Sequence, residues 1–232
     1  MKLKIKTPKG PYYYKYVPIF LGIKPIDKVI AKENLLLLKN ILDKNQLAFL
    51  LSFGTLLGAV REHDFITHDE DIDLIMMKSD MPKFLATLFE LRENGFEIAR
   101  YESRGFLSII RKGEYIDFYF YEDYPEDPTF SYCGRDMYPK RLLEDVAPIE
   151  FQGAMFMAPR DCKKYLEFNY GKDWRTPIPY ANFKMSKIQK AKSLLLQYIK
   201  IMLPESITEK LQRKSDQPFI EKWLTKAKDF DF

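Results

Sequence analysis

The spacing of apolar residues in the first quarter of the chain predicts a helix, a buried strand and a tight connection between them. Apolar residues recur at helical spacing between Pro25 and Lys44, which indicates a helix. The short apolar run from Leu47 to Phe53 is typical of a buried strand, and Gly54 ends it. Residues 55–61 then fit a turn of helix. The segment before this unit, residues 1–24, contains several prolines and tyrosines and reads as extended.

A series of strands follows. The stretch Asp71–Met77 opens with alternating acidic and apolar residues, a period of two that predicts a strand. Ser79 is a candidate helix cap with Pro82 in the first turn, and Gly95 lies beyond the end of that helix. Three further strands are predicted at Phe96–Tyr101, Phe106–Arg111 and Glu114–Tyr121, with Lys112-Gly113 at the last turn.

The second half of the chain predicts fewer strands and more helix. Residues 124–139 read as loop, a short strand pair is expected around 149–156, and a helix is expected from Pro159 to about Tyr170. Two helices are expected over 184–203 and 205–228, separated by Pro204, with Pro218 interrupting the second. The class is α/β (α+β): a mixed sheet, flanking helices and a helical C-terminal extension.

Composition narrows the functional classes. The 232 residues are 46% hydrophobic and 30% charged, which excludes general disorder. Two distant cysteines, Cys133 and Cys162, exclude a disulfide scaffold and a zinc site built from cysteine. Two histidines, His63 and His68, exclude a mechanism that needs several imidazoles. The N-terminus lacks an apolar leader, so a soluble, cytoplasmic protein is expected.

Charge is unevenly distributed along the chain. Residues 1–50 carry 10 Lys and 3 acids, residues 51–130 carry 8 bases and 17 acids, and residues 131–232 carry 19 bases and 13 acids. The acidic middle is either ordinary solvated surface or a metal-holding site between bases that attract phosphates. Nucleic acid is not expected as a partner, because the net charge is only +4 and no RNA-binding signature is present.

The acidic middle contains a pattern that favours a metal site. Alternate side chains of a strand share a face, so Asp71 and Asp73 would point the same way, roughly 7 Å apart, with Ile72 and Leu74 in the core. Two carboxylates held together in an apolar setting share a proton or bind a cation, and Mg²⁺ prefers such oxygen ligands. The alternative is an exposed acidic loop. An EF-hand is excluded, because its sixth and twelfth positions would be Leu74 and Asp80.

Two more features are consistent with phosphate chemistry. Asp117 lies in the middle of a strong predicted strand, where Asp is unfavourable, so it either completes the acidic site or faces solvent. Gly54 and Gly58 permit close backbone approach where a helix begins, and Arg61 is a candidate phosphate ligand. Arg61 has the alternative of pairing with Glu62 or Asp64 at the surface.

Together these blocks resemble the LicD family. The resemblance rests on Gly54-Thr-Leu-Leu-Gly-Ala-Val-Arg61, Phe65-Ile-x-x-Asp69-x-Asp71-Ile-Asp73, Ile116-Asp117-Phe118, Ala158-Pro159, Tyr165-Leu166 and Tyr170-Gly-x-Asp-Trp174-x-x-Pro177. It covers about residues 30–180 and implies a nucleotidyltransferase fold. The family usually has an aromatic residue before three aspartates, whereas here His68 comes first and Glu70 replaces the middle aspartate.

The resemblance implies a function and a role for each matching residue. Members transfer phosphocholine or a polyol phosphate, such as ribitol phosphate, from a CDP-alcohol donor to a hydroxyl of a glycan or lipid-linked glycan of the lipopolysaccharide, capsule or teichoic acid type. By resemblance, Asp71, Asp73 and Asp117 would hold Mg²⁺ (or Mn²⁺), with Asp117 as the candidate base. The donor and its phosphates would meet Gly54, Thr55, Arg61, Asp69, Tyr170 and Trp174. The expected division is an N-terminal segment (1–24), a catalytic domain (25–180) and a basic helical extension (181–232).

Two other functions remain open from the sequence. The same carboxylates would serve a nucleotidyltransferase that uses CTP or ATP and releases pyrophosphate. A non-catalytic binding protein on the same fold is the second alternative. Tyr170 and Trp174 have the alternative of packing the domain closed rather than contacting a donor.

The C-terminal extension has interpretations of its own. Residues 181–232 hold 11 bases and 6 acids, and leucine and isoleucine residues cluster beside Lys190, Lys192 and Lys200. This pattern fits peripheral contact with an anionic membrane at the inner face. It also fits a helix that covers the core or forms a dimer interface.

Overall fold

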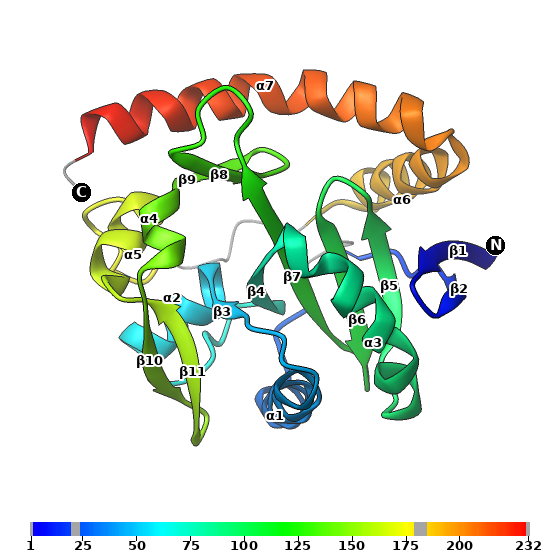
Figure 1. Cartoon of the computed structure of the whole chain (residues 1–232), viewed down its shortest axis with the longest axis horizontal. Coiled ribbons are helices and arrows are strands. Elements are labelled where there is room, and N and C mark those ends of the chain that lie inside the picture. The colour runs from blue at the N-terminus through cyan, green and yellow to red at the C-terminus, as the bar shows by residue number, and fades with distance from the viewer. Residues whose placement is uncertain (1, 20–23, 179–184, 231–232) are drawn as a thin grey trace.

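A mixed sheet forms the centre of the computed structural model, which describes residues 2–19, 24–178 and 185–230 (Figure 1). Its strand order is β10-β11-β3-β4-β7-β6-β5, and β8 and β9 continue from the end of β7. The strands are β3 (Leu50–Leu51), β4 (Asp71–Met77), β5 (Glu97–Glu102), β6 (Phe106–Arg111), β7 (Glu114–Asp123), β8 (Phe130–Cys133), β9 (Asp136–Pro139), β10 (Val146–Phe151) and β11 (Ala154–Pro159). A separate hairpin pairs β1 (Lys2–Thr7) with β2 (Gly10–Lys15).

Helices flank this sheet, and the expected mixed α+β class is confirmed. They are α1 (Lys28–Lys44), α2 (Phe53–Arg61), α3 (Met81–Glu93, after the 3-10 turn Lys78–Asp80), α4 (Lys140–Glu144), α5 (Cys162–Tyr170), α6 (Lys187–Met202) and α7 (Glu205–Asp229). Asp27 caps α1, because its side chain accepts the N–H groups of Val29 and Ile30. Among the described residues, no helix has the length and apolarity needed to cross a membrane.

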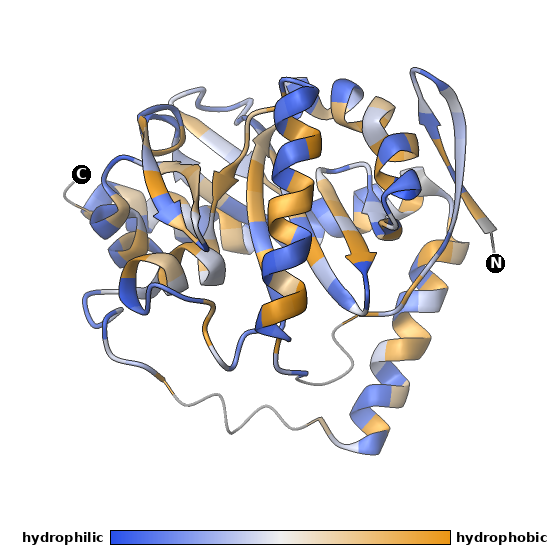
Figure 2. Ribbon diagram, turned by 90° about the horizontal axis from the view of Figure 1, so that it is seen from below, coloured by the Kyte–Doolittle hydropathy of each residue, from blue (hydrophilic) through white to orange (hydrophobic). Residues whose placement is uncertain are grey.

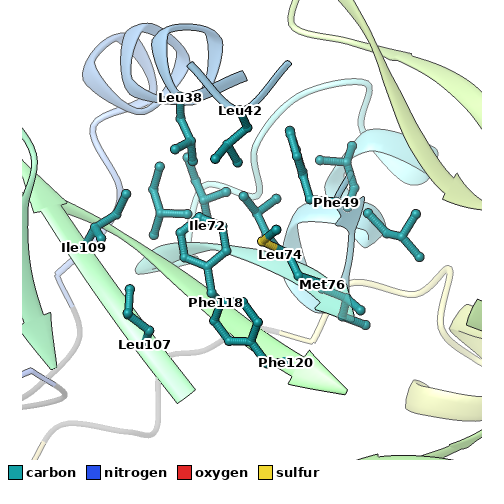
Figure 3. Close-up of a cluster of buried hydrophobic side chains, with 14 of the residues drawn as sticks. Leu38, Leu42, Phe49, Ile72, Leu74, Met76, Leu107, Ile109, Phe118 and Phe120 are labelled. Carbon is teal, nitrogen blue, oxygen red and sulfur yellow. The ribbon is translucent and has the colours of Figure 1, made fainter. Parts of the chain in front are cut away.

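The main core lies between one face of the sheet and the helices α1 and α3. Figure 3 shows Leu38 and Leu42 of α1 above Ile72 and Leu74 of β4, next to Phe118 of β7. Phe84 of α3 contacts the same face, with its ring centroid 4.6 Å from that of Phe118. The apolar even-numbered residues of β4 and β7 therefore face this core. Because side chains alternate along a strand, Asp71, Asp73 and Asp117 lie on the opposite face of the sheet.

Several sequence predictions are corrected. Residues 1–24 are more than extended chain, because 2–15 form a hairpin, and residues 124–139 contain the β8–β9 hairpin rather than loop alone. Pro218 does not interrupt α7, which continues to Asp229. Pro218 is exposed, so water can bind the carbonyl that lost its helical partner, while Ile220 packs in a buried cluster just beyond it. The predicted helix start at 184 and the boundary at 180–181 lie outside the described residues.

Glu102, at the end of β5, ties both C-terminal helices to the sheet. Its carboxylate accepts from Lys200 Nζ of α6 at 2.7 Å and from Gln212 Nε2 of α7 at 3.1 Å. Arg104 Nε lies 2.8 Å away, and Arg104 also pairs with Asp216 of α7. Burial acts to raise the pKa of Glu102, but the charges of Lys200, Arg104 and Arg100 outweigh burial and lower it to about 2.

We expect Glu102→Gln to destabilise the protein at neutral pH and to have less effect in acid. A depressed pKa contributes stability that is present above the unfolded-state value of 4.5 and is lost as pH falls toward about 2. The contribution is at most about 3 kcal/mol. Urea unfolding near neutral pH and in acid would measure it, with the exposed Glu150→Gln as control. A deficit that stayed the same size in acid would contradict this assignment.

Candidate active site

One row of polar side chains crosses four neighbouring strands on the face opposite the main core. Asp73 of β4 is in register with Asp117 of β7, which pairs with Ser108 of β6, which pairs with Arg100 of β5. Paired residues of adjacent strands project from the same face, so the four side chains form a line. The two aspartates predicted from separate motifs are thus brought to adjacent strands by the parallel β4–β7 pairing.

All three predicted metal carboxylates are buried. The relative solvent exposure is 8% for Asp71, 7% for Asp73 and 1% for Asp117. The exposed-loop alternative for Asp71 and Asp73 and the solvent-face alternative for Asp117 are therefore wrong. A buried carboxylate needs a proton, a cation or several hydrogen bonds.

Asp73 is held by hydrogen bonds from two sides. The Tyr119 hydroxyl donates to its Oδ1 at 3.2 Å, and the Gly54 N–H at the start of α2 donates to its Oδ2 at 3.2 Å. The backbone N–H of Asp73 donates to the buried Thr55 hydroxyl oxygen at 2.8 Å. Thr55 therefore positions β4 against α2, a contact that the sequence had not suggested for it.

Burial, together with repulsion between neighbouring carboxylates, raises the pKa of the carboxyl groups of this cluster. Burial raises the pKa of Asp71 well above its usual value, and the charges of Asp73 and Asp117 add to the shift. Burial likewise raises the pKa of Asp73, followed by the charges of Asp69 and Asp117. Burial also raises the pKa of Asp69, to about 6. Binding of protons or of a cation therefore stabilises such a group of carboxyls.

Asp117 is the carboxylate with a cationic partner in this row. Arg100 Nη2 lies 3.1 Å from Asp117 Oδ2, and Arg100 Nε donates to the Ser108 hydroxyl at 3.3 Å. Burial nevertheless raises the pKa of Asp117, although Arg100 acts to lower it. The second oxygen, Oδ1, is buried and has no hydrogen-bond partner. A buried oxygen of this kind has an unmet requirement for a donor or a cation.

The donor set suits a hard divalent cation. Carboxylate oxygens on one sheet face, with one oxygen of Asp117 unpartnered, are the chemistry that Mg²⁺ or Mn²⁺ requires. Within residues 2–19, 24–178 and 185–230, no three acidic, His or Cys side chains are grouped tightly enough to hold a metal as they stand. Asp71, Asp73 and Asp117 would therefore have to converge on an ion.

The start of α2 is shaped to approach Asp69 and Asp73. Phe53, just before the glycine, has a φ of +39°, a left-handed conformation that is unusual for a bulky residue. A Cβ at Gly54 would lie 2.1 Å from Asp69 Oδ2. Glycine is required here because the backbone touches the carboxylate, and the strained Phe53 directs the helix N-terminus toward it.

The predicted donor-binding residues fall into two groups. Gly54, Thr55 and Asp69 adjoin the carboxylates through the contacts above. Arg61 Nη1 donates to the Trp174 carbonyl at 3.2 Å, and its Nη2 pairs with Glu62 at 2.7 Å. The alternative of a pair with Glu62 is thus observed, whereas Asp64 pairs with Lys28. Arg61 Nε is buried without a hydrogen-bond partner, so one donor remains available.

Tyr170 and Trp174 differ in exposure. Trp174 is buried and packs in the core cluster, as the packing alternative expects. Tyr170 is 45% exposed. Burial of its hydroxyl end, followed by the charge of Asp73, raises the pKa of Tyr170 well above its usual value. The Tyr170 hydroxyl is therefore close enough to the acidic cluster to be affected by the charge of Asp73, while part of the side chain is exposed.

Sequence reasoning missed Arg100, Ser108 and Tyr119. The position of Ser108 could have been predicted. The two-residue turn Lys112-Gly113 fixes the register of its hairpin, and this register places Ser108 opposite Asp117. Tyr119 alternates with Asp117 on the same strand face. Arg100 depends on a register shift between Ile98 and Arg100, which no sequence signal marks.

Comparison with known families gives a match over half of the chain. A model described as LicD/FKTN/FKRP, nucleotidyltransferase domain, matches residues 46–161 of the 232. That span contains Asp71, Asp73 and Asp117 and ends before Tyr170. Ribitol-5-phosphate transferase FKTN from Homo sapiens and from Macaca fascicularis are each 29% identical over 168 residues, which is 67% of this chain. The chain spans only about a third (35%) of the length of these relatives.

Two solved structures with partial similarity to this one are an adenylyltransferase and an antibiotic-resistance factor. The lincomycin-bound lincosamide antibiotic adenylyltransferase LnuA has a TM-score of 0.45 at 8% identity, covering 74% of this chain and 98% of its own. The antibiotic-resistance factor ANT(2'')-Ia has a TM-score of 0.44 at 11% identity, covering 88% of this chain and 100% of its own.

Proposed function

Because the chain belongs to the LicD/FKTN/FKRP nucleotidyltransferase-domain family, we propose that it transfers a phospho-alcohol from a CDP-linked donor to a glycan hydroxyl. The observation that carries the proposal is the pairing of Asp73 with Asp117 on one buried sheet face, with Asp71 beside them. This arrangement supplies negative charge where a metal–diphosphate complex would bind. Phosphocholine and polyol phosphates are both candidate groups, and the acceptor would be a glycan of the lipopolysaccharide, capsule or teichoic acid type.

Asp71, Asp73 and Asp117 would hold the metal of this reaction. Bound Mg²⁺ or Mn²⁺ would draw the donor diphosphate to the carboxylates and offset the charge that develops on the phosphate oxygens. Tyr119 and the Gly54 N–H keep Asp73 oriented, and Thr55 fixes its backbone. Asp73 is thus held from two elements, α2 and β7, which would preorganise it for the reaction.

The transfer itself would be an in-line displacement. The acceptor oxygen bonds to the phosphorus that carries the alcohol, the bridging P–O bond to the second phosphate breaks, and CMP leaves with the electron pair of that bond. Asp117 would take the proton of the attacking hydroxyl at its unpartnered Oδ1. Arg100 holds the other oxygen, Oδ2, which would leave Oδ1 for this role.

The donor side would lie at the start of α2 and beside α5. The N-terminus of α2 would offer backbone N–H groups to phosphate. Arg61, at the other end of α2 beside Trp174, has a buried Nε without a hydrogen-bond partner and would reach a phosphate only if its side chain moved. The half-exposed Tyr170 would border the nucleotide end, and the buried Trp174 would support it from the core. Asp69 touches Gly54 and, with a pKa of about 6, can carry a proton that hydrogen-bonds a phosphate oxygen.

CMP release from a panel of CDP-alcohols tests the proposal. CDP-ribitol, CDP-choline, CDP-glycerol and CDP-ethanolamine would be supplied with Mg²⁺, and pyrophosphate release from CTP and ATP would be followed in parallel. We expect metal-dependent CMP release from one donor, which also identifies the alcohol. Pyrophosphate release instead would establish nucleotidyl transfer. Absence of both products, together with absence of a Mg²⁺-dependent thermal shift, would favour the binding-protein alternative and contradict the proposal.

A further inference from the structure

Helix α6 turns its polar face toward the protein. Gln197 Nε2 donates to the Ile19 carbonyl at 3.0 Å, and the Tyr16 hydroxyl donates to Gln197 Oε1 at 2.6 Å. Lys200 on the same face forms the ion pair with Glu102. No residue of α6 is buried. The helix is therefore attached by these polar contacts and by an edge contact of Tyr198 with the Tyr16 ring, and none of its residues is buried in the core.

The apolar face of α6 points away from the protein. Ile188, Leu195, Ile199 and Met202 are 81%, 60%, 45% and 74% exposed. Their spacing of seven, four and three residues places them on one stripe of the helix. Figure 2 shows these apolar bands on the helix that follows the grey segment before α6. A helix that covers a core has the reverse orientation, so that interpretation of α6 is wrong.

Lysines border this stripe, and acidic residues do not. At 3.6 residues per turn, Lys187 falls on one side of the stripe and Lys192 on the other. Residues 187–202 contain four lysines and no Asp or Glu. Long basic side chains beside an exposed apolar stripe can extend to phosphates while their stems stay on the apolar surface.

A second basic element lies at the same end of the molecule. The β1–β2 hairpin is next to α6 (Figure 1), and the ring centroids of Tyr16 and Tyr198 are 5.9 Å apart. Residues 1–24 contain six lysines and no acid. Lys4, Lys6, Lys9 and Lys15 are exposed on this hairpin. The surface around α6 is thus positive on both elements that form it.

We propose that α6 binds an anionic bilayer surface, with its apolar stripe in the interfacial region and Lys187 and Lys192 at the lipid phosphates. Interfacial helices combine an exposed apolar face with basic flanks in this way. Each lysine near such a surface strengthens binding by roughly fivefold, a gain that a neutral surface does not give. Two copies of α6 packed stripe to stripe would instead bring lysines together with no acid on α6 to pair them. Charge therefore favours lipid over a second copy, and the proposal does not depend on the transferase activity.

Sedimentation of the full chain with vesicles tests this surface. We expect binding to vesicles of equal parts phosphatidylcholine and phosphatidylglycerol, weakening with salt, and little binding to phosphatidylcholine alone. Leu195→Gln/Ile199→Gln should abolish it, and Lys187→Gln/Lys192→Gln should weaken it by roughly tenfold to thirtyfold. The four positions are exposed or half-exposed side chains of α6, so circular dichroism and Tm should remain those of the wild type.

Exposed residues of other helices provide matched controls. Lys32→Gln/Lys163→Gln removes two exposed lysines from α1 and α5, and Val29→Gln removes an exposed apolar side chain from α1. Vesicle binding should be unchanged in both. Absence of wild-type binding to anionic vesicles would overturn the proposal, as would equal losses in the control variants. Sedimentation equilibrium showing a dimer that Leu195→Gln/Ile199→Gln dissolves, without vesicle binding, would assign the stripe to self-association and also overturn it.

Discussion

Asp71→Asn is expected to lower metal-dependent transfer about a thousandfold or more while leaving the metal-free protein at least as stable as the wild type. Loss of one carboxylate ligand removes several kcal/mol of charge stabilisation in the transition state, at 1.36 kcal/mol per tenfold. The stability effect has the opposite sign to that of most buried substitutions, because Asp71 is a buried carboxyl repelled by Asp73 and Asp117.

The pH dependence of stability follows from the raised pKa. The folded-state pKa of Asp71 is above the unfolded value of 3.8, so the folded protein keeps a proton that the unfolded chain releases. Stability of the metal-free wild type therefore decreases as pH rises from about 3.8 toward the folded-state pKa. Asn carries no charge, so Asp71→Asn should flatten this decline. Each kcal/mol gained corresponds to roughly 2–4 °C in Tm for a chain of this size.

Three measurements on Asp71→Asn check the assignment. CMP release measures the transfer rate. Differential scanning calorimetry with and without Mg²⁺ measures metal binding, and Tm as a function of pH measures how stability depends on the protonation of Asp71. Asp43→Asn, which removes an exposed i,i+4 ion pair with Lys39, is the control and should change none of them appreciably. A variant that is clearly less stable than the wild type without metal would show that Asp71 is a structural residue.

Asp117→Asn is expected to lose transfer by a factor of about 10²–10⁴ and, unlike Asp71→Asn, to destabilise the fold. The rate loss is the typical contribution of a positioned general base. The destabilisation follows because Arg100 would lose the ionised partner of its buried ion pair. Glu102, 4.0 Å from Arg100, limits the cost to about 1–3 kcal/mol. Neighbouring carboxylates of one site are thus predicted to have opposite effects on stability.

The roles of Asp117 as base and as metal ligand are separable. Mg²⁺ affinity from the thermal shift should fall if Asp117 is a ligand, and the pH–rate profile should lose its acidic limb if it is the base. Arg100→Gln/Asp117→Asn should recover stability relative to Asp117→Asn alone, because no buried charge is then left unpaired. Near wild-type turnover of Asp117→Asn at unchanged metal occupancy would contradict the base assignment.

Local sequence pattern was sufficient for most of the elements that carry the site. The alternation of Asp71, Ile72, Asp73 and Leu74 predicts both β4 and the face on which its aspartates lie, because apolar burial fixes the parity of a strand. The unfavourable position of Asp117 within an apolar strand predicted that it belongs to the same site. The helices α1, α2, α3, α5 and α7 were predicted within a few residues, whereas the short helix α4 was missed and Pro218 does not interrupt α7.

Pairing between distant strands was not accessible from the sequence. That Asp73 and Asp117 are in register depends on the parallel β4–β7 pairing, a contact between segments more than 40 residues apart. The sequence also could not predict that the apolar stripe of α6 faces outward, because the same periodicity fits a helix that covers a core. Only the contacts of Gln197 and Lys200 decided which face meets the protein.

Arg100 marks the limit of what the sequence pattern could predict about the site. By itself the sequence determined the acidic strand β4 and the glycine-bounded helix α2, because each depends on the pattern of neighbouring residues. It also predicted one metal site for the three aspartates, which stays a prediction. Ile98 and Arg100 should share a face by strand alternation, yet Ile98 is buried in the core and Arg100 pairs with Asp117. The irregularity between them in the β5–β6 register reverses that parity. Only the tertiary structure decided on which face Arg100 lies. The position of a bulge depends on how the whole sheet pairs and packs, so no local sequence pattern marks it.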